Sequence, residues 1–102
     1  MKRQISRSST VVAAKDQVSC DLGREAVILN LKSGVYYGLD PVGARVWSLI
    51  QEPRTVNVVL DTLLEEYDVE PGRCESDLFV LLDDLAGRDL LEIKPEPNGV
   101  AK

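Results

Sequence analysis

Residues 34–47 read Gly-Val-Tyr-Tyr-Gly-Leu-Asp-Pro-Val-Gly-Ala-Arg-Val-Trp, and this stretch decides the fold because it joins a strand pattern directly to a helix pattern. Its first half, Val35 to Leu39, is short, aromatic and β-branched, which is typical of a strand. In its second half, Asp40 is a good N-cap and Pro41 suits the first helical position, where a missing N–H costs no hydrogen bond. The stretch therefore predicts a strand over 35–39 and a helix from residue 41.

Before this stretch, the sequence predicts an antiparallel meander. Residues 25–32 are the clearest strand, because Val27, Leu29 and Leu31 share one face while Ala26, Ile28 and Asn30 share the other. Residues 32–34 form a tight turn that returns the chain antiparallel into 35–39. One or both of the segments 10–14 and 18–22 supply a first strand. The strand over 35–39 can lie at the edge of the sheet, where its unpaired backbone groups are open to another chain.

After this stretch, the apolar spacing becomes helical. The first helix stops at Glu52-Pro53, and Trp47 is expected to anchor the core. Thr55 caps a second helix, Glu70-Pro71 starts a third, and Gly87 is the expected C-terminal stop of the third helix. Residues 90–93 can form a short C-terminal strand. Strands followed by helices indicate an α+β domain, and the last two helices with that strand outline a winged helix-turn-helix.

The length and composition predict one domain with a tail at each end. The 102 residues are 44% hydrophobic and 28% charged, as in an ordinary globular domain. We expect a flexible tail over 1–9, a domain over 10–93 and a disordered tail over 94–102. No apolar run approaches the roughly 18 residues of a membrane span, and the basic N-terminus lacks the apolar run of a secretory signal. The expected location is therefore the cytoplasm, with no membrane partner.

The residues of catalysis are largely missing. The chain has no histidine, which removes the commonest general base and the commonest metal ligand. Cys20 and Cys74 match no metal-binding spacing and are expected to be free thiols, and the chain has no glycine-rich phosphate loop. We therefore predict no catalytic residue, no metal, no cofactor and no enzymatic activity.

The winged-helix outline raises DNA binding as a rival function, and charge argues against it. Residues 70–88, which contain the helix that would enter the major groove, carry five acidic residues and two arginines, a net charge of −3. Phosphate would repel such a helix. The formal charge of the whole chain is −5, which favours a neutral or basic partner over a nucleic acid.

Residues 37–50, Tyr-Gly-Leu-Asp-Pro-Val-Gly-Ala-Arg-Val-Trp-Ser-Leu-Ile, resemble the signature of the PqqD-like family. The resemblance continues through Arg54-Thr55-Val56, Leu63-Leu64-Glu65-Glu66-Tyr67-Asp68-Val69, Leu81-Leu82-Asp83-Asp84-Leu85, Gly87 and Leu90-Leu91. It covers roughly residues 20–93. The order and spacing of these segments together are more specific to the family than any one segment. The N-terminal extension over 1–17 is longer than is typical of the family.

This resemblance implies a three-stranded antiparallel sheet packed on three helices, and a function in peptide recognition. Domains of this family bind the leader peptide of a ribosomally made precursor, which adds as a strand against the third strand and enters a cleft against the third helix. The closest type is the discrete recognition protein of lasso-peptide biosynthesis, which hands the precursor to a separate cysteine peptidase and an ATP-dependent cyclase. The alternative is a peptide chaperone for a radical-SAM or other modifying enzyme.

The predicted peptide-binding residues come from the third strand and the third helix. Val35, Tyr37 and Leu39 share one face of the strand and Tyr36 lies on the other, so only one set can face the helices. On the helix, Asp77, Leu81 and Asp84 lie along one flank with Leu78 nearby, and the two carboxylates could accept hydrogen bonds from a peptide. The alternatives are that the strand residues form ordinary core and that the carboxylates form a solvated rim.

Overall fold

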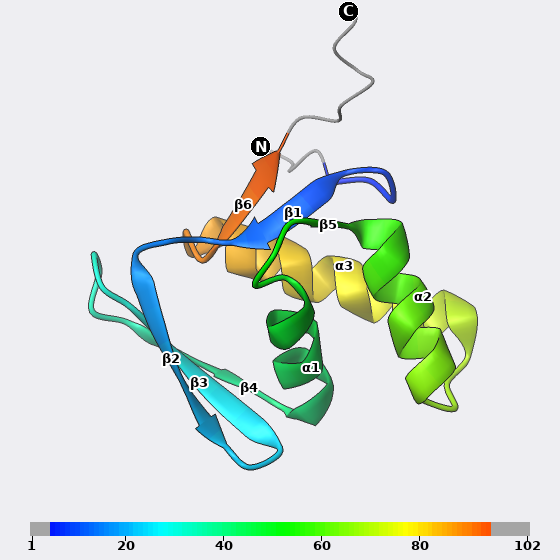
Figure 1. Ribbon diagram of the computed structural model, residues 1–102, viewed down its shortest axis with the longest axis horizontal. Helices are drawn as coiled ribbons and strands as arrows, with labels where there is room; N and C mark the ends of the chain where they lie inside the picture. The colour runs from blue at the N-terminus through cyan, green and yellow to red at the C-terminus, as the bar shows by residue number, and fades with distance from the viewer. Residues whose placement is uncertain (1–4, 95–102) are drawn as a thin grey trace, which may run out of the picture.

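Two small antiparallel sheets and three helices make up residues 5–94, the part of the chain that the computed structural model describes (Figure 1). The predicted α+β class and its winged-helix-like arrangement are confirmed. In chain order the elements are β1 (Thr10–Ala13), β2 (Gln17–Leu22), β3 (Glu25–Asn30), β4 (Tyr36–Leu39), α1 (Pro41–Leu49), β5 (Arg54–Thr55), α2 (Val56–Glu66), α3 (Pro71–Gly87) and β6 (Leu91–Lys94). Of the two predicted tails, residues 1–4 and 95–102 lie outside the described residues.

The predicted meander is the sheet β2-β3-β4, with β3 in the middle. Ile28 of β3 pairs with Ser19 of β2 and Tyr37 of β4. The buried side chain of Asn30 fixes the β3–β4 turn, because its Oδ1 accepts hydrogen bonds from the backbone N–H groups of Lys32 and Ser33 at 2.8 and 3.2 Å. Its Nδ2 donates to the carbonyl of Arg88 at 3.0 Å, which ties the turn to the end of α3.

The second sheet has the strand order β5-β1-β6 and is built from segments far apart in the sequence. Both predicted N-terminal segments form strands, but only β2 belongs to the meander. Strand β1 pairs along its whole length with the C-terminal strand β6. Val11 of β1 is fully buried, and the backbone N–H of Ala13 donates to the carbonyl of Ile50 at the end of α1, 2.8 Å away. The strands nearest the two ends of the described chain therefore lie side by side in one sheet.

The three predicted helix starts are confirmed by their caps. The Asp40 side chain accepts a hydrogen bond from the backbone N–H of Gly43 at 2.8 Å, and Thr55 accepts one from Val58 at 3.3 Å. Glu70 accepts from Arg73 at 2.8 Å. The predicted stop of α3 is confirmed, because Gly87 is its last helical residue, and the left-handed residue that follows is Asp89, with φ 59°. Asp tolerates this conformation better than most residues because its short side chain can hydrogen-bond locally.

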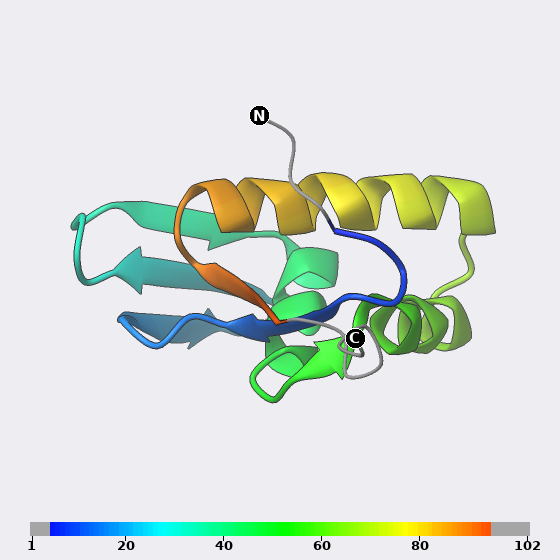
Figure 2. The same cartoon turned by 90° about the horizontal axis from the view of Figure 1, so that it is seen from above.

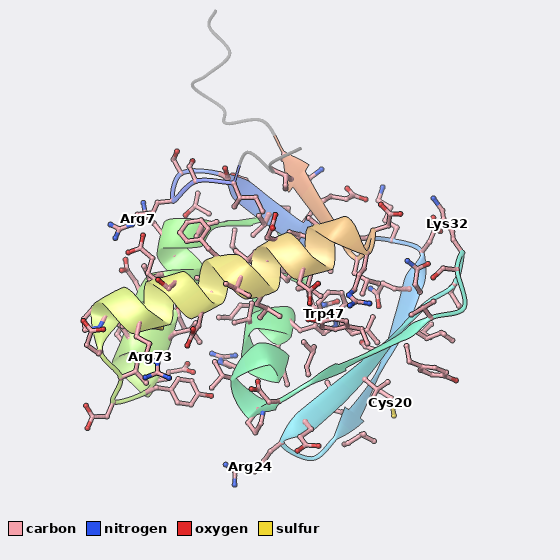
Figure 3. The ribbon with its side chains drawn as sticks, turned by 180° about the vertical axis from the view of Figure 1, so that it is seen from behind. Arg7, Cys20, Arg24, Lys32, Trp47 and Arg73 are labelled. Carbon is pink, nitrogen blue, oxygen red and sulfur yellow. The ribbon has the colours of Figure 1, made fainter. Side chains whose placement is uncertain are left out.

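The core lies between the β2-β3-β4 sheet and the helices. The side chains of Ala26 and Ile28 in β3 are buried in this core, and those of Val27 and Leu29 lie on the opposite face of the sheet. Trp47 of α1 is 4% exposed, which confirms it as a core residue, and Figure 3 shows its side chain directed into the interior. Long side chains of α2 and α3, such as Leu63 and Leu82, complete the same cluster.

Residues 5–9, which the sequence places in the N-terminal tail, make hydrogen bonds to the start of α2. The backbone N–H groups of Val56 and Asn57 donate to the carbonyls of Ser9 and Arg7 at 3.0 and 2.9 Å. The guanidinium of Arg7 also pairs with Glu75 of α3. This segment therefore satisfies first-turn donors of α2 that lack intrahelical partners.

No helix within residues 5–94 is both long enough and apolar enough to cross a membrane.

Candidate functional site: the β4 edge and its groove

Strand β4 forms one edge of its sheet and pairs only with β3 among the described strands. The backbone N–H of Asn30 donates to the carbonyl of Val35 at 3.0 Å, which places the inward-facing backbone groups at residues 35, 37 and 39. The N–H and C=O groups of Tyr36 and Gly38 therefore point away from β3. The edge offers two donors and two acceptors to an incoming chain.

A groove of about 640 Å³ lies beside this edge, between β4, the start of α1 and helix α3. Six of the eight sequence-predicted site residues line it, two from β4 and four from α3. They are Tyr37, Leu39, Asp77, Leu78, Leu81 and Asp84. In Figure 2, β4 is the strand of its sheet nearest α3 and β2 is the farthest. The structure thus brings the predicted strand and helix residues together around one concave surface.

Tyr37, Asp84 and Arg88 form a polar contact where β4 meets α3. The Tyr37 hydroxyl donates to Oδ2 of Asp84 at 2.7 Å, and Nε of Arg88 donates to Oδ1 at 3.3 Å. The Arg88 guanidinium also lies 4.9 Å from the centre of the Tyr37 ring, within cation–π range. This contact holds the strand against the helix and occupies both oxygens of Asp84.

The contact shifts the ionisation of both hydrogen-bonded partners. Burial, followed by the hydrogen bond to the Asp84 carboxylate, raises the pKa of Tyr37 to about 12. The same hydrogen bond, assisted by Arg88, holds the pKa of Asp84 below its usual value. At neutral pH the tyrosine is therefore a donor and the aspartate a charged acceptor.

Asp77 differs from Asp84 although both line the groove. Within the described part of the chain it forms no hydrogen bond or ion pair, so both carboxylate oxygens remain open to a ligand. It lies one helical turn after Arg73, another groove residue, whose position on α3 is labelled in Figure 3. The groove therefore presents both signs of charge near the start of α3.

The remaining two predicted residues lie outside this groove. Val35 is half exposed and lines a smaller hollow of about 350 Å³ together with Tyr37, Lys32 and Arg88. Tyr36 is 68% exposed and its side chain lies on the face opposite Tyr37. For Tyr36 it is the backbone, rather than the side chain, that faces the open edge.

The groove residues that the sequence reasoning did not place in the site include three exposed valines. Val42, Val69 and Val80 line the groove and are 42%, 45% and 69% exposed. They come from α1, the α2–α3 loop and α3. An exposed valine within an amphipathic segment has the same sequence signature as a buried one, so only the fold identifies them. Exposed apolar side chains gathered in one hollow are typical of a binding site.

The groove has the composition of a peptide or small-ligand site rather than a metal centre. Among residues 5–94, no group of three or more Cys, Asp and Glu side chains is placed to hold a metal ion. Both cysteines are free, and burial raises the pKa of the Cys74 thiol at the groove wall. What the groove can do chemically is to bury apolar side chains and pair with backbone and cationic groups.

Comparisons with known proteins agree with this geometry. Residues 25–91 match the model of the family described as coenzyme PQQ synthesis protein D, PqqD. A solved structure described as "TbiB1 in Complex with the TbiA(beta) Leader Peptide" is 38% identical in sequence, over 79% of this chain and 94% of that chain, with a TM-score of 0.74. Comparison with curated protein sequences gives no match.

Proposed function

This chain belongs to the PqqD family, and from that premise we propose that it is a non-catalytic carrier that binds the leader peptide of a ribosomally made precursor. The leader adds as a strand to the open edge of β4 and places alternate side chains in the groove against α3. The observation that carries the proposal is the position of the outward-facing backbone groups of Tyr36 and Gly38 directly beside a groove lined by exposed apolar residues. Strand addition uses these two features together, backbone bonds for attachment and pockets for specificity.

The likeness to TbiB1, a protein solved in complex with a leader peptide, supports this choice of ligand. The two chains are alike over 94% of the known one, and the family match over residues 25–91 includes β4, α1 and α3, which build the groove. A peptide fits the site better than a compact small molecule because the groove runs along an unpaired strand. Asp77 is a groove carboxylate with both oxygens free to accept hydrogen bonds from a hydroxyl or cationic side chain of the leader.

The energetics indicate that the groove decides affinity. Four backbone hydrogen bonds contribute about 4 kcal/mol at about 1 kcal/mol each. Two buried apolar anchors add roughly 3–6 kcal/mol. Association costs about 4 kcal/mol or more, plus the ordering of the leader. The backbone bonds therefore only offset the cost of association, and the apolar anchors supply the net affinity, which we expect to be about micromolar or tighter.

The carrier hands its bound precursor to enzymes that act on it. In a lasso-peptide type of pathway these are a separate leader peptidase and a cyclase, and in the alternative they are a radical-SAM or other peptide-modifying enzyme. The genes beside this chain discriminate the two. A short precursor with transglutaminase-like peptidase and asparagine-synthetase-like genes supports the first pathway, and a radical-SAM gene supports the second.

Fluorescence polarisation with a labelled leader peptide from the adjacent precursor tests the proposal. We expect saturable binding, about micromolar or tighter, with no binding to a scrambled leader or to duplex DNA. If the protein bound the duplex and not the leader, it would be a winged-helix regulator in spite of its net charge of −5. If it bound neither, the proposal of a leader carrier would be wrong.

A further inference from the structure

The smaller hollow, of about 350 Å³, lies at the start of β4, between the β3–β4 turn and the end of α3. Lys32 and Val35 line it from the turn and β4, and Arg88 and Leu90 line it from the other side. Tyr37 lines both this hollow and the groove, so the two lie on either side of one side chain. We call this second cavity the turn hollow.

The turn hollow and the groove differ in charge. Among the described residues that line the turn hollow are two cations, Lys32 and Arg88, and one acid, Asp89. The described residues that line the groove include three carboxylates and one guanidinium. The turn hollow is therefore the basic end of a site that is acidic elsewhere.

The guanidinium of Arg88 has hydrogen-bond donors left for a ligand. Its Nε donates to Oδ1 of Asp84 at 3.3 Å, and neither Nη atom donates a hydrogen bond to another described residue. A guanidinium has five N–H donors, so four remain. The group lies 4.9 Å from the centre of the Tyr37 ring, which holds it at the wall between the two cavities. Two Nη groups in one plane match the two oxygens of a carboxylate.

Lys32 adds a second cation at the rim of the turn hollow. Its Nζ lies 3.4 Å from a carboxylate oxygen of Asp16, and the two side chains are 75% and 61% exposed. An ion pair this exposed is weak, because water screens it and two long side chains must give up conformational freedom to form it. The ammonium group can therefore turn to a ligand carboxylate at little cost.

A strand added to β4 passes both cavities. The leader side chains that face the helices lie beside Val35, Tyr37 and Leu39, because neighbouring residues on paired strands share a face. Val35 lines the turn hollow and Leu39 lines the groove. The leader residues at these two points are four positions apart, about 13 Å along a strand.

Resting on the proposed function, we propose that the turn hollow is a subsite for an acidic side chain of the leader, Asp or Glu, four residues from the apolar side chain that lies beside Leu39. The Nη groups of Arg88 bind its carboxylate, and Lys32 approaches it from the rim. An apolar or basic residue at this point leaves the cations without a partner, so the subsite discriminates between leaders. It also sets the register, because a slip of one residue turns the acid to the other face.

Fluorescence polarisation with the labelled leader of the adjacent precursor tests the subsite. Each Asp and Glu of the leader is replaced, one at a time, by Asn or Gln, which keeps the shape and removes the charge. Each peptide is titrated with full-length wild type, Arg88→Gln, Arg88→Lys and Lys32→Gln. Arg24→Gln is the matched control, because Arg24 is an exposed arginine of the β2–β3 turn and lines neither cavity. Circular dichroism establishes that each variant is folded.

We expect one acidic leader position to couple to the two cations. Its replacement should raise the Kd for wild-type protein about tenfold, and Arg88→Gln should raise the Kd of the unchanged leader by about the same factor. Arg88→Lys, which keeps the charge and loses the fork, should raise it about threefold. Lys32→Gln should also raise it about threefold, and Arg24→Gln should leave it unchanged.

The two changes made together show whether Arg88 binds the leader itself. Arg88 also contacts Tyr37 and Asp84, and loss of that contact would weaken every leader by the same factor. If Arg88 binds the leader carboxylate, Arg88→Gln should change the Kd of the neutralised leader by less than twofold. An equal loss with both leaders would assign Arg88 a structural role and overturn the inference.

The remaining failures are distinguishable from a failure of the proposed function. If the wild-type protein binds the leader but no acidic position couples to Arg88 or Lys32, the subsite is wrong and the leader carrier stands. The same holds if the leader that binds has no acidic residue four positions from an apolar residue that binding requires. Absence of leader binding by the wild-type protein would reject the proposed function and the subsite with it.

Discussion

The two edges of the β2-β3-β4 sheet have the same backbone chemistry and different surroundings. At the β4 edge the outward groups belong to Tyr36 and Gly38. At the β2 edge they belong to Ser19 and Asp21, because the N–H of Leu31 donates to the carbonyl of Asp16 and sets the alternation. Strand β2 is longer, with six residues against four, and is exposed along almost its whole length.

Helix α3 accounts for the difference between the edges. It lies along β4 and supplies one wall of the groove, whereas β2 is the strand farthest from it (Figure 2). An added strand could form the same hydrogen bonds at either edge but would bury side chains only at β4. If the proposed function is correct, the comparison explains the choice of edge, because only at β4 does a neighbouring helix supply pockets for the side chains of an added strand.

The largest expected effect comes from the helix wall. Leu81→Asp replaces a half-buried groove residue of α3 with a charge. The lost apolar contact and the burial of a carboxylate beneath the leader together cost about 3 kcal/mol, so we expect leader affinity to fall about 100-fold. Fluorescence polarisation measures this change, and circular dichroism establishes that the variant is folded.

Leu22→Asp at the β2 edge is the matched control for that experiment. It makes the same chemical change at a residue that is more than half exposed and lies outside the groove. We expect its leader affinity to be within twofold of wild type. Unchanged affinity in a folded Leu81→Asp variant would remove α3 from the binding site and with it the distinction between the two edges.

A smaller effect is expected from the backbone of the edges. Gly38→Pro removes an outward N–H of β4, and an ideal Cβ at this position meets no atom within 4 Å. Proline is tolerated on edge strands whose N–H faces solvent. The loss of one hydrogen bond at about 1 kcal/mol, together with the carbonyl left unpaired on the leader, predicts roughly a tenfold loss of leader affinity.

Ser19→Pro removes an outward N–H from the β2 edge and should leave leader affinity unchanged. Isothermal titration calorimetry on both folded proline variants measures the difference. Equal losses at the two edges would mean that the leader does not pair specifically with β4. A loss for Ser19→Pro alone would place the added strand on β2, away from the groove.

The sequence predicted the features that local chemistry controls. Asp40, Thr55 and Glu70 each accept a hydrogen bond from a backbone N–H two or three residues ahead, so their caps could be predicted from neighbouring residues. The turn between β3 and β4 and the alternation of Ile28 against Val27 are equally local. Six predicted residues line one groove because each lies on the side of β4 or α3 that faces it, and both elements could be predicted from local patterns.

Features that depend on distant segments could not be predicted in the same way. The pairing of β1 with β6 joins residues some eighty positions apart, and a short β-branched run does not encode its partner. Val42, Val69 and Val80 meet only after α1 and α3 have packed. Asp89, rather than Gly87, adopts the left-handed conformation beyond α3. The preceding residue, Arg88, accepts a hydrogen bond on its carbonyl from the side chain of Asn30, which is distant in sequence.

The smallest expected effect concerns the contact that holds β4, and not β2, against α3. Tyr37→Phe removes the hydrogen bond to Asp84 and should lower the free energy of unfolding by about 1 kcal/mol at pH 7. Tyr36→Phe is the control, because Tyr36 is mostly exposed and its hydroxyl makes no hydrogen bond within residues 5–94. Urea denaturation should show no measurable loss for the control.

The pH dependence identifies this hydrogen bond as the source of the loss. The pKa of Tyr37 is raised to about 12, so its stabilising contribution is complete below its ordinary pKa of about 10 and is lost as the pH rises through 12. The pKa of Asp84 is lowered, so its contribution is present above its ordinary value of 3.8 and is lost as the pH falls through the folded-state pKa. The difference between wild type and Tyr37→Phe should therefore be constant near neutrality and shrink at both extremes. A difference that persisted undiminished in acid would assign the loss to packing of the ring, and β4 would then be held to α3 by apolar contact alone.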